Sequence, residues 1–181
     1  MRRCHPVPRV VLLTDARNDH RLEWAVSRMP RGSALVFRHY HLPIAARRAR
    51  FEALRRLCAR RGVLVITAGE ARGWRADGHY GAPRDLGRGS GLRPRQRPGL
   101  HLATAHSLAE IGAAVRARAC AILLSPVFPT RSHPGAPVLG PVRFLLLARR
   151  SPLPIIALGG MTKPRAARLP VWGWAAIDGL A

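Results

Sequence analysis

The chain has 181 residues and a formal net charge of +22, from 31 basic and nine acidic residues. This length suits one domain spanning residues 1–181 and is too short for two. It also lies below roughly 200 residues, the low end for a complete eight-stranded α/β barrel, so such a barrel would need shortened helices.

The positive charge by itself would suit a nucleic-acid-binding protein. All basic residues except Lys163 are arginines, however, and they are spread from Arg2 to Arg168. No arginine-rich tail, RNA-binding signature or zinc-finger spacing accompanies them, so we expect no specific nucleic-acid partner. Contacts with nucleic acid should be independent of sequence and weakened by salt.

Cysteine usage and hydropathy predict a cytoplasmic protein with no membrane partner. The three cysteines are far apart and odd in number, which indicates reduced thiols, two of them buried: Cys4, Cys58 and Cys120. The apolar stretch at 10–13 is too short for a signal peptide. No apolar run approaches the roughly 18 residues of a membrane span.

Eight short apolar runs predict eight β-strands. They cover residues 9–14, 34–37, 63–66, a segment beginning at 77, 100–103, 120–124, 154–158 and 175–177. Helical patterns follow most of them, at 21–27, 43–61, 107–118, 140–150 and a short segment beginning at 162. Strands that alternate with helices predict a parallel sheet, and eight strands predict its closure. The expected fold is a compact α/β TIM barrel with shortened or missing crossover helices.

Residues 43–61 form the clearest helical pattern, which Gly62 ends. One apolar stripe contains Ile44, Phe51, Leu54 and Cys58. We expect a solvated face for Arg47, Arg55, Arg56 and Arg60. Residues 81–99 are rich in Gly, Pro and Arg, and we expect a mobile loop with little that can be buried.

The last three strands end in turns rich in Gly, Pro, Thr and Ser, where α/β barrels keep active sites and phosphate sites. Gly159 and Gly160 would let the backbone approach a phosphate closely. Two hydroxyls and a titratable cation after strand six suit a pyrophosphate: Thr130, Ser132 and His133. A tight glycine turn and a proline-anchored loop with incidental hydroxyls remain alternatives.

These segments read ILLSPVFPTRSHPGAPVLG at 122–140, IIALGGMT at 155–162 and AAIDGL at 175–180. In order and spacing they resemble the thiamine phosphate synthase/TenI-like family. The resemblance implies coupling of a hydroxymethylpyrimidine pyrophosphate to a thiazole phosphate, with Mg²⁺ as cofactor and pyrophosphate as leaving group. The small-molecule partners would thus be a phosphorylated pyrimidine and a phosphorylated thiazole. Whether the chain forms a homo-oligomer stays open.

The resemblance also implies roles for individual residues. Catalytic contacts to the pyrophosphate would come from Arg38, Thr130, Ser132 and His133. Thr104 would line the pocket, and Asp85 would bind the metal. The thiazole phosphate would be held by Gly159, Gly160, Ile177 and Asp178.

The chain departs from the family pattern at several functional positions. A Gln, a Lys, a metal-binding Asp and a second Lys are replaced here by Val36, Tyr40, Ala68 and His133. Asp178 stands where the family has a small residue, and its charge would repel a phosphate. These changes predict a poor synthase with an unusual dependence on Mg²⁺, or a degenerate TenI-like protein that binds a phosphorylated heterocycle without turning it over.

Three further features bear on this choice. Pro126 stands where the tautomerase branch has a His, so the loop has the synthase form. Arg84 and Arg131 lie on the relevant loops and would supply missing positive charge. His39 and His41 suit a pair of partly exposed loop histidines better than a metal pair, since no acid accompanies them.

Overall fold

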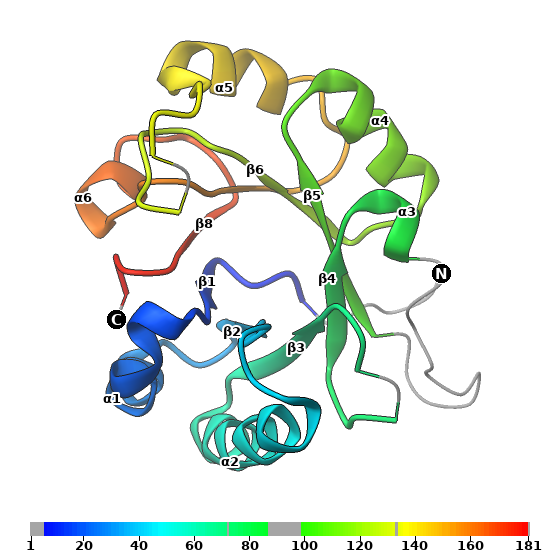
Figure 1. Ribbon diagram of the computed structural model, residues 1–181. Helices are drawn as coiled ribbons and strands as arrows, with labels where there is room; N and C mark the ends of the chain where they lie inside the picture. The colour runs from blue at the N-terminus through cyan, green and yellow to red at the C-terminus, as the bar shows by residue number, and fades with distance from the viewer. Residues whose placement is uncertain (1–5, 72, 87–98, 133, 181) are drawn as a thin grey trace.

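Eight short, mostly apolar runs form parallel strands that pair in chain order and close into a barrel (Figure 1). The computed structural model describes residues 6–71, 73–86, 99–132 and 134–180. The strands are β1 Val10–Leu13, β2 Ala34–Phe37, β3 Leu64–Ala68, β4 Gly78–Gly81, β5 Leu100–Ala105, β6 Ala121–Leu124, β7 Ile155–Ala157 and β8 Gly173–Ala176. Closure occurs between β1 and β8, in the register Val10↔Trp174. The predicted barrel is confirmed.

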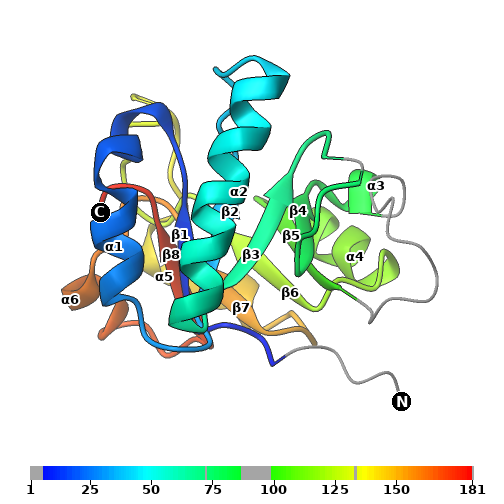
Figure 2. The ribbon, with the colours of Figure 1, turned by 90° about the horizontal axis from the view of Figure 1, so that it is seen from below.

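The helices surround the strands and several are very short, as the length of the chain predicts (Figure 2). They are η1 Ala16–Arg21, α1 Leu22–Arg28, α2 Ile44–Arg61, α3 Pro83–Leu86, α4 Leu108–Arg116, α5 Gly140–Ala148 and α6 Lys163–Ala166. The Ser107 hydroxyl accepts from the Glu110 N–H at the start of α4, and Thr162 caps α6 in the same way. No helix is described between β3 and β4. None of the described helices is long and apolar enough to span a membrane.

Apolar side chains fill the barrel and the layer between strands and helices. One buried cluster draws residues from seven strands and fills the barrel, including Val11, Val36, Ile66, Leu102 and Leu123. Two further clusters pack helices against the outside of the strands. Cys58 is buried and Cys120 half-buried, and no disulfide joins these two cysteines of the described chain. Cys4 lies outside the described residues.

Two expectations about α2 are wrong. Ile44, placed on the apolar stripe, is 64% exposed, and Arg47, placed on the solvated face, is 6% exposed. The Arg47 guanidinium donates to three carbonyl oxygens: Nε to Arg38 at 2.9 Å, Nη1 to Glu70 at 2.8 Å and Nη2 to Ala68 at 2.6 Å. These bonds join the chain just beyond β2 and β3, and they offset the cost of burying a charge.

Aromatic rings complete the environment of Arg47. Its guanidinium carbon lies 5.2 Å from the Trp74 ring centroid, 5.3 Å from that of Tyr40 and 5.8 Å from that of Phe37. Burial lowers the pKa of Arg47 from its ordinary value. The side chain is therefore a fixed cation that links the segments following β2 and β3, at the end of the barrel where the strands have their C-termini.

Two other boundaries differ from expectation. Residues 83–86 form α3 and bury Leu86, so this part of the expected loop does contribute to the core. Residues 87–98 of that loop lie outside the described residues. Strand β8 begins at Gly173, two residues earlier than predicted, because a glycine there lets the backbone approach Arg9: a Cβ would lie 2.4 Å from the Arg9 carbonyl oxygen.

We expect Arg47→Leu to lower the free energy of unfolding by about 3–5 kcal/mol, because three carbonyl oxygens would lose a charged donor. Urea denaturation at neutral pH measures this change. Arg48→Leu, on the exposed neighbouring residue of the same helix, should cost less than about 0.5 kcal/mol. If both variants lost the same amount of stability, Arg47 would not link the two segments as described.

Candidate functional site

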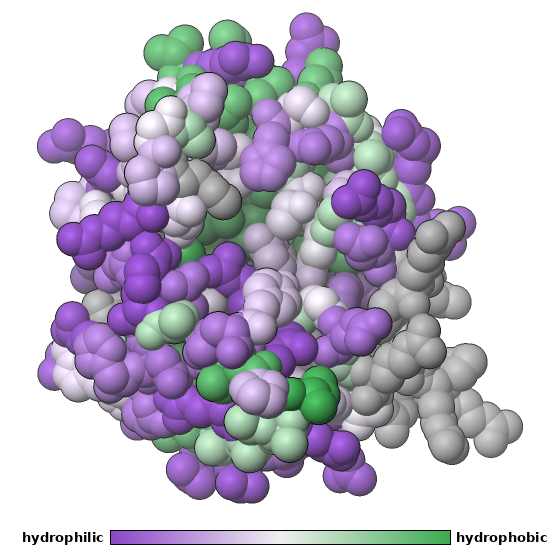
Figure 3. Space-filling model, viewed as in Figure 1, coloured by the Kyte–Doolittle hydropathy of each residue, from purple (hydrophilic) through white to green (hydrophobic). Residues whose placement is uncertain are grey.

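A cavity of about 590 Å³ opens at the C-terminal ends of the strands. Figure 3 looks onto this end and shows the surface hollowed near its centre, inside a largely hydrophilic rim. Most of the lining comes from the loops after β6, β7 and β8. The rest comes from the ends of four other strands: Leu13 of β1, Arg38 directly after β2, Tyr80 of β4, and Thr104 and His106 at the end of β5. This is the end at which α/β barrels build their sites.

Three glycines hold these loops together. A Cβ on Gly159 would lie 2.7 Å from the Pro126 Cα, and one on Gly160 would lie 2.5 Å from the Pro129 carbonyl oxygen. Both glycines also have positive φ, +97° and +60°, which favours glycine. A Cβ on Gly179 would lie 2.2 Å from the Met161 carbonyl oxygen. The loop after β7 is thus packed against the other two through backbone contacts.

The loop after β7 presents polar backbone groups to the cavity. Within the described chain, the N–H groups of Gly159 and Gly160 donate to no protein group. Arg165 lines the same part of the cavity, donates to the Gly160 carbonyl oxygen and lies 4.6 Å above the Phe128 ring. Unpaired N–H groups beside a guanidinium form a surface suited to an anion.

Arg38 lies directly after β2 and is oriented by two bonds. Its Nε donates to the Thr14 carbonyl oxygen at 3.0 Å, and its Nη2 donates to the Asp15 carboxylate at 2.8 Å. Nη1 and one hydrogen of Nη2 remain without a partner among the described residues. The guanidinium lines the cavity and has a fixed direction there.

Asp15 is the centre of a network that sequence reasoning missed. Its other oxygen accepts from Arg17 Nε at 2.9 Å. Arg17 Nη2 donates to the Ser132 hydroxyl oxygen at 2.9 Å, and Arg17 Nη1 lies 3.8 Å from the Asp178 carboxylate. Burial raises the pKa of Asp15, but the hydrogen bonds from Arg17 and the charges of Arg17 and Arg38 outweigh it and leave the pKa below its usual value. The position of Asp15 just after β1 was the available signal.

Asn18 ties this network to the end of the chain. Its side-chain oxygen accepts from the Asp15 N–H at 2.8 Å, and its amide donates to the carbonyl oxygens of Leu13 at 3.1 Å and Ile177 at 3.0 Å. Asn18 is buried, so these bonds form in a protected environment. They fix the segment after β8 against the segment after β1.

His39 is linked to Arg38 through the Thr14 hydroxyl, and its burial differs from the expected exposure. It is 1% exposed, whereas we expected a partly exposed loop histidine. Nε2 bonds the Asp19 carboxylate at 2.9 Å, which assigns the hydrogen to Nε2, so Nδ1 accepts from the Thr14 hydroxyl at 2.7 Å. The same hydroxyl oxygen accepts from the Arg38 N–H at 2.9 Å. His39 thus positions the backbone that carries Arg38.

His106 lies directly after β5, in a segment at 104–107 that resembles the family pattern, but sequence reasoning gave its side chain no role. Its Nδ1 donates to the Ser125 carbonyl oxygen at 2.8 Å, which leaves Nε2 as an acceptor. The imidazole lines the cavity beside Thr104.

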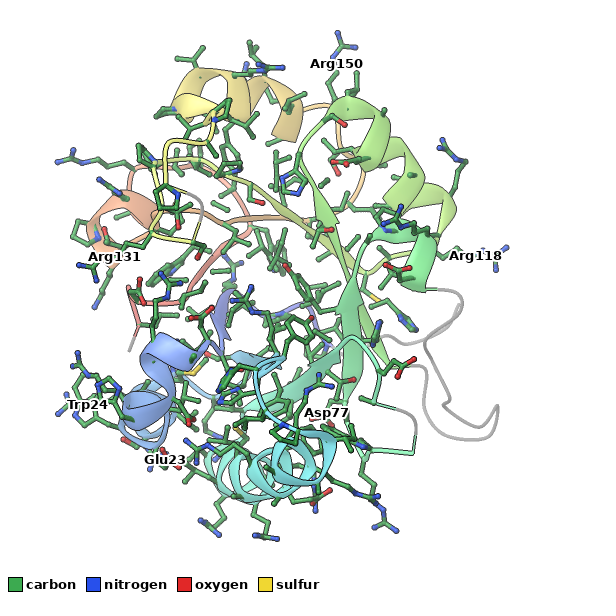
Figure 4. All side chains as sticks on the ribbon, viewed as in Figure 1. Glu23, Trp24, Asp77, Arg118, Arg131 and Arg150 are labelled. Carbon is green, nitrogen blue, oxygen red and sulfur yellow. The ribbon has the colours of Figure 1, made fainter. Side chains whose placement is uncertain are left out.

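The structure brings together most of the residues that the sequence indicated. The cavity is lined by Arg38, Thr104, Thr130, Ser132, Gly159, Gly160, Ile177 and Asp178. Arg131 also lines it, and Figure 4 shows this residue beside α6. Asp85 does not line the cavity: its side chain is 57% exposed and lies 3.9 Å from that of Arg84. His133 lies outside the described residues.

Mg²⁺, which the family resemblance implies, does not fit the side chains present. The described part of the chain contains no group of three or more His, Cys, Asp or Glu side chains that could hold a metal. Asp15, the carboxylate beside Arg38, has both oxygens bonded to guanidinium groups. Asp85, the expected ligand, is not among the residues that line the cavity.

We expect Gly160→Ala to cost about 1–3 kcal/mol more stability than Gly135→Ala. Both residues have positive φ, so both variants carry the same backbone penalty, but a Cβ at Gly135 meets nothing within 4 Å. Urea denaturation of the two variants measures the difference. If they were equally stable, the loops after β6 and β7 would not be in the close contact described.

Burial lowers the pKa of His39 although its bond to Asp19 raises it, so the folded protein holds His39 neutral. The unfolded chain takes up this proton near pH 6.5, so stability should fall as the pH drops below that value, by up to about 1.4 kcal/mol per pH unit. His39→Asn should remove this part of the decline between pH 7.5 and 5.5 in urea denaturation. His20→Asn, on an exposed residue, should follow the wild type. Parallel declines in all three proteins would refute the assignment.

Comparisons with known proteins agree with the barrel fold. The family model described as thiamine monophosphate synthase matches residues 10–180. A thiamine phosphate pyrophosphorylase from Pyrococcus furiosus is similar in structure, with a TM-score of 0.73, 22% identity, and coverage of 94% of this chain and 85% of that one.

Two other solved structures share the fold at lower identity. A FabK mutant from Thermotoga maritima has a TM-score of 0.69 and 16% identity, covering 96% of this chain and 62% of its own. A structure described as native KDPGal has a TM-score of 0.58 and 14% identity, covering 97% and 84%. The search of curated proteins gave no match. Because the family model spans nearly all of the sequence, the chain belongs to the thiamine monophosphate synthase family.

Proposed function

We propose that the cavity binds a phosphorylated pyrimidine and a phosphorylated thiazole and joins them with release of pyrophosphate. The observation that carries this proposal is the meeting of oriented hydroxyls, guanidinium groups and unpaired backbone N–H groups in one cavity. Its volume of about 590 Å³ lies within the usual range for small-molecule sites. Family membership supports the same chemistry.

The thiazole phosphate would occupy the side of the cavity formed by the loops after β7 and β8. Gly159 and Gly160 offer unpaired N–H groups there, and Arg165 adds a positive charge. The bond from Asn18 holds the Ile177 carbonyl, so the segment after β8 has a fixed position. Asp178 lies on the same side, and its charge is offset in part by Arg17 at 3.8 Å.

The pyrophosphate would face the loop after β6 and Arg38. Thr130 Oγ1 accepts from the Ser132 N–H at 3.3 Å, and the Ser132 hydroxyl oxygen accepts from Arg17, so both hydroxyls keep a hydrogen to donate. When the bond between the pyrimidine methylene carbon and the pyrophosphate oxygen breaks, the electron pair leaves with the pyrophosphate. Preorganised donors such as Arg38, Thr130 and Ser132 stabilise that developing charge. The thiazole nitrogen then forms the new bond to carbon.

A second candidate function, binding of a phosphorylated heterocycle without turnover, is favoured by one observation. Asp15 accepts from both Arg38 and Arg17, and so its carboxylate compensates part of the charge that a leaving pyrophosphate requires. The same contacts still permit binding of a ground-state anion. The cysteine spacing, which predicts reduced thiols, supports a cytoplasmic location for either function.

The proposal predicts that mixing both substrates with the protein yields pyrophosphate and the coupled product. Arg38→Ala should lower kcat by about 10²–10³, because one preorganised donor to the leaving group is lost. Arg150→Ala is the matched control, since Arg150 points outward beyond α5 and does not line the cavity (Figure 4). Absence of turnover in the wild type, together with retained binding of the thiazole phosphate, would favour the binding function instead.

A further inference from the structure

The chain has very few groups from which to build a Mg²⁺ site. Mg²⁺ in proteins is usually held by one or two carboxylates together with waters and substrate phosphates, so the protein's own share of such a site is carboxylate oxygen. All nine carboxylate side chains fall within the described residues: Asp15, Asp19, Glu23, Glu52, Glu70, Asp77, Asp85, Glu110 and Asp178. Every acidic side chain of the chain therefore has a described position, and each can be compared with the cavity lining.

Only one of these nine carboxylates lines the cavity, and that one is Asp178. It lies 3.8 Å from Arg17. The nearest second carboxylate along the network is Asp15, whose two oxygens already bond Arg17 and Arg38. A cation at this position would have to displace two guanidinium groups, so the local charge opposes its binding.

The end of β3 carries a protein cation in place of a metal ligand. Ala68 has no side-chain oxygen, and its carbonyl oxygen accepts from Arg47 Nη2 at 2.6 Å. Arg47 has no carboxylate partner; its partners are carbonyl oxygens and aromatic rings. No carboxylate among the described residues therefore compensates its charge, which repels a divalent cation at this rim and attracts an anion.

Guanidinium groups also dominate the lining. Arg38, Arg131 and Arg165 all line the cavity, against the single carboxylate of Asp178. Arginine presents several donors in a planar fork that matches phosphate oxygens. We propose that this pocket holds the phosphate or pyrophosphate of its ligand through guanidinium groups without a divalent cation, so that the metal-free anion is the form it binds. This inference rests on the anion-binding pocket of the proposed function, and it replaces Mg²⁺ held by Asp85.

The test is direct binding of inorganic pyrophosphate to the full chain, by titration calorimetry in about 0.15 M NaCl, where exposed charges are screened beyond about 8 Å. With EDTA present we expect one saturable site. Added Mg²⁺ should weaken the apparent affinity, because it complexes free pyrophosphate in solution. Arg131→Ala and Arg165→Ala should each weaken binding at least about tenfold, the loss expected for one charge-assisted hydrogen bond. Arg150→Ala should leave it unchanged.

Three outcomes would overturn the inference. Binding that disappears in EDTA and returns with Mg²⁺ would show that a metal mediates it. Equal affinity in the Arg131→Ala, Arg165→Ala and Arg150→Ala variants would show that the charge of the molecule, and not the pocket, holds the anion. Failure to bind pyrophosphate under either condition would reject the anion pocket as a whole.

A second measurement asks about the metal without the anion. Mn²⁺, a spectroscopic substitute for Mg²⁺, should show no bound signal in electron paramagnetic resonance when titrated into the protein alone. A bound ion that is lost in Asp85→Asn or Asp178→Asn would overturn the inference. The coupling reaction and the metal-free binding can fail separately. A protein that binds metal-free pyrophosphate but shows no turnover would contradict the coupling reaction and support metal-free binding.

Discussion

The pocket depends on contact between the backbones of three loops. Where Gly160 meets Pro129 and Gly179 meets Met161, even a methyl group would come within 2.5 Å of a carbonyl oxygen. Closure of the barrel between β1 and β8 brings the loops after β6, β7 and β8 to one rim, and the glycines then let them touch. As a result, hydroxyls from one loop and N–H groups from another keep fixed relative positions, which a binding site for a small anion requires.

Carbonyl oxygens hold Arg47 and Arg165, and several other arginines are oriented by the few carboxylates of the chain. Two of them, Asp15 and Asp19, lie in the short segment after β1. Asp15 orients Arg17 and Arg38 toward the cavity, and Asp19 accepts from His39 and from Arg50 at 2.8 Å. With 31 basic residues and nine acidic ones, the chain has too few carboxylates to pair with most of its arginines. The net charge therefore does not indicate which arginines belong to the site, whereas the positions of Asp15 and Asp19 explain how Arg17, Arg38 and Arg50 are oriented.

The fold could be predicted from the sequence because parallel strands are buried on both faces and appear as short apolar runs. The turns after β6, β7 and β8 were visible for a related reason, since glycine and proline at a strand end have few other uses. Burial of Arg47 could not be predicted: its partners are carbonyl oxygens of loops after β2 and β3, which leave no trace in residue identity. The position of Asp85 could not be predicted either, because no pattern in the sequence indicated α3, which places this residue outside the cavity lining.

Networks that cross the rim were hidden in the same way. Asn18 has the sequence context of an ordinary turn residue. Its bonds to the carbonyl oxygens of Leu13 and Ile177 form only because β8 lies beside β1. The bond from Arg17 to Ser132 joins residues 115 positions apart. Such pairings depend on strand order and on side-chain direction, and one sequence specifies neither by its local pattern.

The departures from the family pattern on the β2–β3 side of the rim form one coherent change. Ala68 stands at a metal-ligand position and Tyr40 at a lysine position, so one negative and one positive charge are missing there. Both residues contact Arg47: the Ala68 carbonyl oxygen accepts from it, and the Tyr40 ring centroid lies 5.3 Å from its guanidinium carbon. A lysine at position 40 would bring a second cation beside Arg47 with no carboxylate to separate them. Both departures therefore lie beside the buried guanidinium of Arg47, and the rim lacks the second cation that a lysine at position 40 would have added to it.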